Sequence, residues 1–277
     1  MSSHDLKNVQ SHFAFGANWA SYSQKVTESE IAEAVNALAR LLGKSRLDGA
    51  RFLDIGCGSG LHSLAALRMG AREVVAVDLD TDSVSTSRAM LGRFAPNSSV
   101  LVKHVSVFDL DPLSLGLFDV VYSWGVLHHT GDMNLAIRRA AAMCAPDGLF
   151  AFALYRRVWL DWFWRIEKKW YAKSAVFVQR CARMLYIFLY KVALLIGGHN
   201  PSRFILNYRT RGMEFYHDVH DWMGGWPYES ILPVEVDSLM NHIGFAAEML
   251  PVKRGKILGR DLGVFGSGCD EYLYKRV

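Results

Sequence analysis

The feature of the sequence that most constrains the fold is a repeated alternation between short apolar runs and helix-like segments. Helical patterns at 61–69, 82–91 and 133–144 separate the apolar runs, and each pattern ends at a glycine or at the turn Pro146-Asp147-Gly148. Strands that alternate with helices in this way form a parallel sheet with helices on both faces. The five apolar runs are 51–55, 73–78, 100–105, 118–123 and 149–154.

The regions on either side of this alternation complete the predicted architecture. Before it, Thr27 and Glu30 form a capping box ahead of a helix whose apolar residues share one face. After it, a long aromatic and basic stretch precedes two final strand candidates at 246–252 and 271–276. We therefore expect an α/β fold with a doubly wound, mostly parallel sheet of seven strands, and a helical insertion before the last two strands.

Composition places the chain among ordinary globular proteins. Its 277 residues are 51% hydrophobic and 21% charged, and a formal charge of +4 is too small to indicate a nucleic-acid partner. Four cysteines stand far apart without a CxxC pair, which favours a reducing, cytoplasmic setting over a disulfide framework or a zinc site. The N-terminus lacks the apolar region of a signal peptide, and no apolar run reaches the roughly 20 residues of a transmembrane helix. We expect a monomer or a homodimer.

A glycine-rich loop follows the first apolar run. Gly56, Gly58 and Gly60 lead directly into the first helical pattern. Glycine lets the backbone turn sharply off a strand and approach a ligand closely, at the carboxyl edge where open α/β sheets bind ligands. A dinucleotide fold has the spacing GxGxxG, whereas the third glycine here comes one residue early.

Two acidic residues narrow the choice of ligand. Asp54, just ahead of the loop, suits a cofactor with a cationic amine better than one with a pyrophosphate. Asp78 ends the second apolar run about 20 residues after Gly56, where a carboxylate can accept both hydroxyls of a ribose. Together with the glycines, these carboxylates indicate a ribosyl cofactor.

Four motifs in series resemble those of class I S-adenosylmethionine-dependent methyltransferases. They are LDIGCGSG, VVAVDLD, FDVVYSWGVLHHT and APDGLFAF, and they span residues 51–155. The chain is similar to the small-molecule methylases often grouped with those of quinone biosynthesis. The resemblance implies a Rossmann-like fold, S-adenosylmethionine as cofactor and transfer of its methyl group to a small molecule.

The resemblance also implies roles for individual residues. The glycines surround the methionine part and the ribose, Asp54 lies near the amine, and Asp78 holds the ribose diol. Residues after the third strand face the adenine, Trp124 lies near the methyl group, and an N-terminal aromatic pair folds over the cofactor or simply packs. The implied cofactor-binding residues are Asp54, Gly56, Gly58, Gly60, Asp78, Leu79, Val107, Phe108, Asp109, Trp124, Trp19 and Tyr22.

Candidate acid–base residues for the methyl acceptor lie in 128–129 and 216–222. A histidine near neutrality can take the acceptor's proton, and a neighbouring carboxylate can orient it. In a helix, His217, His220 and Asp221 would share one face, which could also hold a metal, but a helix N-terminus or a hydrogen-bond network needs fewer assumptions and we predict no metal. The predicted acid–base residues are His217, Asp218, Asp221 and His128.

A second group is predicted to bind the acceptor itself. The segment 221–229 resembles the DWxGGxPxE segment of related methylases, where it contributes to the acceptor pocket or its lid. The Asn-Pro-Pro-aromatic motif typical of enzymes that methylate nucleic-acid or protein amino groups is missing. Arg209 could pair with an anionic or carbonyl group, and a solvated surface loop is the alternative. The predicted acceptor-binding residues are Tyr208, Arg209, Trp222 and His129.

The insertion carries an unusual mixture of tryptophan and positive charge. Residues 156–191 contain nine Lys or Arg and two Asp or Glu, so this segment accounts for more than the whole net charge. If one helix runs from about Arg165 to Ile196, its basic residues form one stripe and the rest is nearly all apolar. We expect this apolar face to cap the open edge of the sheet, with contact to an anionic membrane surface as the alternative.

Four parts and two rival functions follow from these patterns. Residues 1–50 form a helical segment over the cofactor, 51–155 the cofactor-binding core, 156–243 the cap with the acceptor site, and 244–277 the final strands. A nicotinamide-dependent oxidoreductase is the first rival, which the glycine spacing disfavours. A non-catalytic, membrane-associated protein that binds S-adenosylmethionine is the second.

Overall fold

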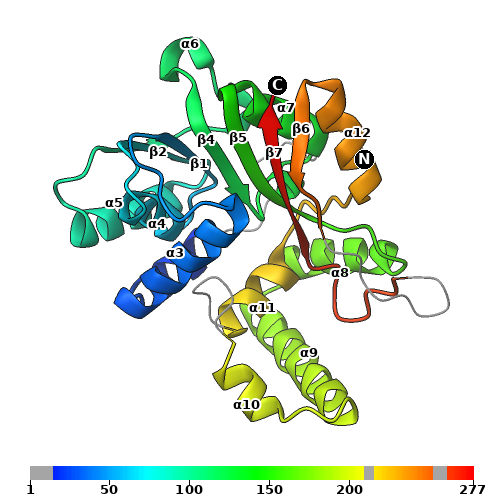
Figure 1. Ribbon diagram of the computed structural model, residues 1–277. Coiled ribbons are helices and arrows are strands. Elements are labelled where there is room, and N and C mark those ends of the chain that lie inside the picture. Colours follow the sequence, from blue (N-terminus) through cyan, green and yellow to red (C-terminus); the bar gives the residue numbers. More distant parts are fainter. Residues whose placement is uncertain (1–14, 209–214, 252–260) are drawn as a thin grey trace.

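The computed structural model describes residues 15–208, 215–251 and 261–277. One seven-stranded sheet has the order β3-β2-β1-β4-β5-β7-β6, in which β7 runs antiparallel to both of its neighbours and the other pairs are parallel (Figure 1). This confirms the predicted mostly parallel sheet. The strands are β1 (Arg51–Ile55), β2 (Glu73–Asp78), β3 (Val100–His104), β4 (Phe118–Trp124), β5 (Cys144–Tyr155), β6 (Phe245–Met249) and β7 (Cys269–Arg276).

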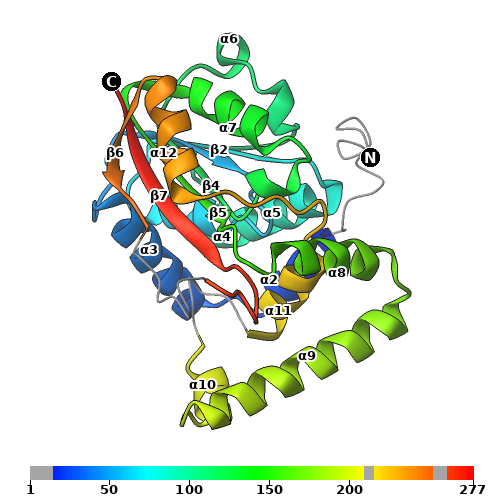
Figure 2. The same ribbon diagram turned by 90° about the vertical axis from the view of Figure 1, so that its right-hand side faces the viewer.

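Helices cover both faces of the sheet, as predicted (Figures 1 and 2). Side chains alternate along each strand, so Phe52 and Val74 pack under one helical layer while Leu53 and Val75 pack under the other. Both sets are buried, which is why these strands read as continuous apolar runs. The first layer consists of α3 (Glu28–Leu42), α4 (Leu61–Arg68) and α5 (Thr81–Phe94), and the second includes α7 (Met133–Ala142) and α12 (Pro233–His242).

The last two strands are joined to the sheet by aromatic pairs. Phe152 on β5 lies opposite Tyr272 on β7, and their rings stack at a centroid distance of 5.2 Å. Phe150 lies opposite Tyr274, and all four rings are fully buried. Cross-strand aromatic pairs of this kind stabilise a sheet beyond their hydrogen bonds. The sixth strand is shorter than expected: it ends at Met249, and residue 252 lies outside the described residues.

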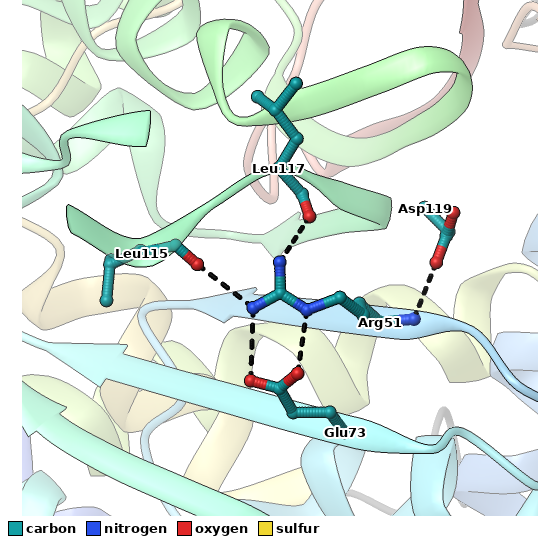
Figure 3. A network of polar contacts seen from close by, with 5 residues as sticks. All are labelled: Arg51, Glu73, Leu115, Leu117 and Asp119. Atoms are coloured by element: carbon teal, nitrogen blue, oxygen red, sulfur yellow. Dashed lines mark hydrogen bonds and ion pairs between the residues drawn. The ribbon is translucent and has the colours of Figure 1, made fainter. Parts of the chain in front are cut away.

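An arginine network closes the amino-terminal end of the sheet (Figure 3). The Arg51 guanidinium makes a two-pronged ion pair with Glu73 and donates to the carbonyl oxygens of Leu115 and Leu117. The backbone N–H of Arg51 donates to Asp119 at 2.7 Å. These bonds tie β1 and β2 to α6 (Pro112–Leu115) and to the start of β4. They lie at the opposite end of the strands from the glycine loop, so we assign them a structural role.

The insertion contains several helices rather than the single long one expected. They are α8 (Asp161–Lys173), α9 (Val176–Ile196), α10 (Pro201–Leu206) and α11 (Phe215–Gly224). The predicted helix over 165–196 is wrong because the chain becomes extended at Ser174 and Ala175. Ser174 donates its hydroxyl to the Trp170 carbonyl, and Gln179 donates to the carbonyls of Tyr171 and Ser174, so side chains satisfy the end of α8.

Shorter elements complete the described chain. The α2 helix (Gly16–Ser23) precedes α3, and the short helices η2 (Val107–Asp109) and η3 (Leu127–His129) follow β3 and β4. The capping box predicted for α3 is present at Thr27 and Glu30. Among the residues that the structure describes, no helix is long and apolar enough to cross a membrane.

Candidate active site

A cavity of about 1180 Å³ lies at the carboxyl edge of the sheet. Strand ends and the loops that follow β1, β2 and β3 form one part of it, which we call the loop half, with Asp54, Gly56, Asp78 and Phe108 among its residues. We call the other part the aromatic half, because aromatic side chains from β5, α9 and α11 line it. Its aromatic residues are Tyr155, Tyr186, Tyr190, Tyr208, Phe215, Trp222, Trp226 and Phe265.

The glycine loop folds back against the end of β2. Gly56 has a φ of +74°, and its N–H donates to the Val77 carbonyl at 2.8 Å. A Cβ atom at this position would come within 2.3 Å of Val126, so both the backbone and the space require glycine. Gly58 also has a positive φ, and the Trp19 ring covers it. The loop brings Gly56, Cys57 and Ser59 to the cavity wall.

Asp78 is fixed by this loop. Its two carboxylate oxygens accept the N–H groups of Gly58 and Asp80, each at 2.9 Å. Burial raises the pKa of Asp78 to about 6, while these backbone hydrogen bonds act in the opposite direction. Each oxygen keeps a second lone pair, so the carboxylate can accept two hydroxyl groups of a ligand.

Asp54 is more deeply buried, with 2% of its surface exposed. Ser63 donates its hydroxyl to it at 2.6 Å, and burial raises the pKa of Asp54 to about 7, with a further rise caused by nearby Asp78. Within the described ranges, no Lys or Arg forms an ion pair with either carboxylate. Two buried acids beside the glycine loop fit a ligand that brings an ammonium group and a ribose diol.

The remaining residues predicted to bind the cofactor divide into two groups. Leu79, Val107, Phe108, Asp109, Trp124 and Trp19 line the cavity, and the Trp124 indole donates to Glu271 on β7 at 2.8 Å. Gly58 and Gly60 shape the loop without lining the cavity. Tyr22 lies behind it, buried against the rings of Trp19 and His217.

The aromatic half contains three titratable side chains that were predicted. Asp218 accepts the Tyr208 hydroxyl and Asp221 accepts the Asn18 amide, both at 2.7 Å. His129 places Nδ1 at 2.7 Å from the Pro227 carbonyl, so Nδ1 carries the proton and Nε2 is the ring nitrogen able to accept one. These three groups and Trp222 line the cavity, as does Tyr208.

Two predicted acid–base residues do not line this cavity. His217 borders a separate pocket of about 350 Å³ between α9 and α11, which corrects its expected place in the acceptor pocket. His128 is fully buried beneath the Tyr155 ring, and burial holds its pKa well below the usual value, so it stays neutral. Consecutive positions in the η3 turn send His128 into the core and His129 to the cavity. Arg209 lies outside the described residues.

Several cavity residues were missed because their positions depend on long-range contacts. Tyr155 ends β5 at the carboxyl edge, and Glu271 reaches the same edge because β7 runs antiparallel to β5. Lys168 on α8 is fully buried behind the cavity wall, with Nζ 3.6 Å from the centroid of the Trp222 ring and no hydrogen-bond partner among the described residues. Burial lowers the pKa of Lys168 to about 7.

The segment with His217, His220 and Asp221, considered above as a possible metal-binding face, is helical in α11. Tyr171 and Arg183 contact Nδ1 of His220, and Asn18 contacts Asp221. A group of three or more His, Cys, Asp or Glu side chains that could hold a metal ion is absent from the part of the chain that the structure describes.

Comparison with known proteins shows which family the chain belongs to and which fold it shares. Over 115 residues, 31% are identical to a ubiquinone biosynthesis O-methyltransferase of Rhodopseudomonas palustris, covering 42% of this chain and 44% of that protein. A protein of the same description from Xanthomonas campestris pv. campestris is 41% identical over 113 residues, covering 40% of this chain and 45% of the relative. The chain therefore matches less than half the length of these relatives.

A solved structure extends the fold comparison to the insertion. Magnesium protoporphyrin IX methyltransferase of Synechocystis PCC 6803, with bound S-adenosylhomocysteine, superposes with a TM-score of 0.52 at 13% identity. The superposition covers 89% of this chain and 83% of that protein, which shows a shared fold. The family model described as a methyltransferase domain matches residues 26–186, more than half of the chain. The chain therefore belongs to the methyltransferase-domain family and shares the Rossmann-like fold of that solved methyltransferase.

Proposed function

We propose that this protein transfers the methyl group of S-adenosylmethionine to a small aromatic molecule bound in the aromatic half. The observation that carries the proposal is the continuity of one cavity, which joins buried Asp54 and Asp78 to a region lined by aromatic rings. Ligand sites of this kind combine apolar walls with a few placed polar groups. An aromatic acceptor would bury its rings against Tyr155, Trp222 and their neighbours.

The cofactor would bind with its ammonium group near Asp54 and its ribose hydroxyls on Asp78. When bound, it supplies a methyl group activated by a sulfonium. Transfer is an in-line displacement, so much of the acceleration comes from holding the acceptor in line with the methyl group, worth roughly 7–11 kcal/mol in favourable cases. Trp124, fixed by Glu271, and Trp19, packed on Gly58, would restrict the space around the reacting atoms.

We propose that the acceptor atom is a hydroxyl oxygen and that its proton passes to Nε2 of His129. The O-methyltransferases among the relatives support a hydroxyl acceptor. Among the three titratable groups in the aromatic half, His129 is the imidazole, and histidine is the side chain that most often acts as a general base in enzymes. Asp218 and Asp221, oriented by Tyr208 and Asn18, would bind polar substituents or help to position the proton.

A binding and turnover assay tests this function. We expect S-adenosylhomocysteine to raise the melting temperature and NAD to leave it unchanged. Hydroxylated aromatic compounds should accept labelled methyl groups from S-adenosylmethionine, whereas the same rings without a hydroxyl should not. Stabilisation by NAD alone, or cofactor binding without methylation of any hydroxylated aromatic compound, would contradict the proposal.

We also propose a reducing, cytoplasmic setting and a monomeric or homodimeric state. Among the described residues, no disulfide joins the four cysteines Cys57, Cys144, Cys181 and Cys269, which fits a compartment that keeps thiols reduced. Fractionation of the source cells and light scattering of the purified protein measure location and assembly directly. Recovery from an oxidising compartment, or a larger assembly, would contradict this part.

A further inference from the structure

The outer face of α9 is apolar and uncovered. Although α9 is 21 residues long, none of its residues is buried. The residues classed as exposed on one side of this helix follow helical spacing from end to end, and the exposed fractions of Phe177 and Ile196 reach 77% and 83%. They are Phe177, Cys181, Met184, Leu185, Phe188, Leu189, Leu195 and Ile196.

The opposite face of α9 lines the cavity through Tyr186 and Tyr190. One face of the helix therefore contributes to the cavity while the other is exposed. In Figure 2, α9 lies at the outer edge of the molecule. A surface helix of a globular protein normally turns its polar residues outward. An apolar outer face of this length indicates contact with something other than water.

The outer side of α8 has the same character. Trp162, Phe163, Ile166 and Trp170 are all exposed, and Lys173 lies among them in the helical order. Tryptophan next to Lys or Arg is typical of helices that lie in the interface of a membrane.

The charge of this surface distinguishes between two candidates that could cover α8 and α9, a second copy of the chain and a lipid bilayer. The exposed charged residues of α8 and α9 are Arg165, Lys173 and Arg180, all basic. Arg165 pairs with Asp161 at 3.6 Å, and Lys191 is half-buried beside them. Asp161 is mostly covered and accepts the Tyr228 hydroxyl. A second copy of the chain would bring further positive charge to this surface, whereas an anionic bilayer would neutralise it.

A basic pocket borders the apolar face. It lies between α9 and α11, and Arg180, Arg183, His217 and His220 line it together with Met184. Met184 also belongs to the exposed apolar face, so the pocket opens at the edge of that face. Arginine side chains beside apolar surface suit a phosphate headgroup whose acyl chains lie alongside.

We propose that the outer faces of α8 and α9 dock on an anionic lipid bilayer. On this surface the apolar residues enter the boundary between headgroups and acyl chains, and Arg180 and its neighbours contact phosphate groups. The inference goes beyond the proposed function and does not depend on which acceptor is methylated.

Co-sedimentation of the full chain with vesicles tests the proposal. We expect recovery with phosphatidylcholine vesicles that contain phosphatidylglycerol, weaker recovery at high salt, and little with phosphatidylcholine alone. Replacing Arg180 and Lys191 together by Gln should lower the partition coefficient about fivefold for each charge removed. Replacing Leu185 and Phe188 together by Glu should abolish recovery.

Matched controls lie elsewhere on the surface. Leu113→Glu changes an apolar residue of α6 that is 97% exposed, and replacing Arg138 and Arg139 by Gln removes two exposed charges from α7. Both controls should bind vesicles like the wild type. All variants should bind S-adenosylhomocysteine normally, which separates this test from that of the proposed function.

Three outcomes would overturn the proposal. The first is absence of recovery with anionic vesicles, and the second is equal recovery with neutral and anionic vesicles. The third is a dimer in light scattering that dissociates when Leu185 and Phe188 become Glu, because a second copy would then cover the face. Normal methyl transfer alongside any of these results would leave the proposed function intact.

Discussion

The sheet region, 51–155, and the helical insertion, 156–243, build the two halves of the cavity by different means. In the sheet region, backbone loops and two buried carboxylates form the site. In the insertion, aromatic side chains do so together with Tyr155 of β5 and Phe265, and the buried amine of Lys168 lies behind them. Each region therefore buries an ionisable group, but the charges are opposite in sign. Local geometry determines the first region, whereas packing between distant segments determines the second.

The largest expected effect separates the chemistry of the two regions. His129→Asn should lower kcat by roughly 10²–10⁴ while cofactor affinity stays nearly unchanged, because the imidazole is proposed to accept the acceptor's proton. Steady-state kinetics and calorimetry measure the two quantities.

His217→Ala is the matched variant, since His217 borders the other pocket. Near-normal turnover is expected for it. The reverse result, with turnover lost in His217→Ala and retained in His129→Asn, would restore the role that the sequence suggested for His217.

The buried acid of the sheet region should make stability depend on pH. Burial raises the pKa of Asp54 to about 7, whereas an unfolded Asp titrates near 3.8. Between these values the folded state binds more protons, so its stability falls as pH rises, by on the order of 4 kcal/mol. Denaturant unfolding of wild type and Asp54→Asn, without cofactor, should show a shallower fall in the variant over this range. If the free energies of unfolding of the two proteins changed with pH in parallel, the pKa of Asp54 would be the same in the folded and unfolded states.

The buried base of the insertion should act in the opposite direction. Burial lowers the pKa of Lys168 to about 7 from 10.5, so between these values the unfolded state binds more protons and stability rises with pH. Lys168→Met should therefore stabilise the protein at pH 7, by roughly 1–4 kcal/mol. The gain should shrink as pH approaches 10.5. Destabilisation at pH 7 would mean that the stacking of Nζ on Trp222 outweighs the cost of burial.

The smallest of these effects concerns cofactor affinity. Asp78→Asn should weaken binding of S-adenosylhomocysteine by roughly 1.5–3 kcal/mol, because the ribose hydroxyls lose a charged acceptor. Calorimetry measures the dissociation constant, and Glu248→Gln, an exposed change on β6, is the control. An unchanged dissociation constant in Asp78→Asn would show that Asp78 does not bind the ribose hydroxyls.

The sequence predicted the sheet region almost residue by residue. Strands β1 and β2 have the expected bounds, and Asp54, Gly56 and Asp78 meet at one edge because parallel strands end there. The positions of residues at the ends of parallel strands can be derived from the order of strands and helices along the chain. Local residues also decide the end of α8, but the side chains of Ser174 and Gln179 that satisfy it leave no periodic signal.

Positions in the insertion could not be derived in the same way. Asn18 reaches Asp221 from the other end of the chain, and Lys168 is buried only because α11 packs on α8. Within the sheet region, the neighbouring histidines of η3 also have opposite surroundings, which neither spacing nor composition reveals. The packing of distant segments, rather than any local pattern, selects His129 over His217 at the cavity.

The place of β7 in the sheet has a consequence for how the chain matures during synthesis. β7 lies between β5 and β6, and it is formed by residues 269–276, near the end of this sequence. Until these residues leave the ribosome, β5 has an open edge and the segment of β6 has no strand to pair with. The nascent sheet therefore exposes apolar surface of Phe150 and Phe152 at this edge, which Tyr272 and Tyr274 later cover. Nascent chains stalled before residue 269 should accordingly recruit chaperones, and chains released after β7 should not.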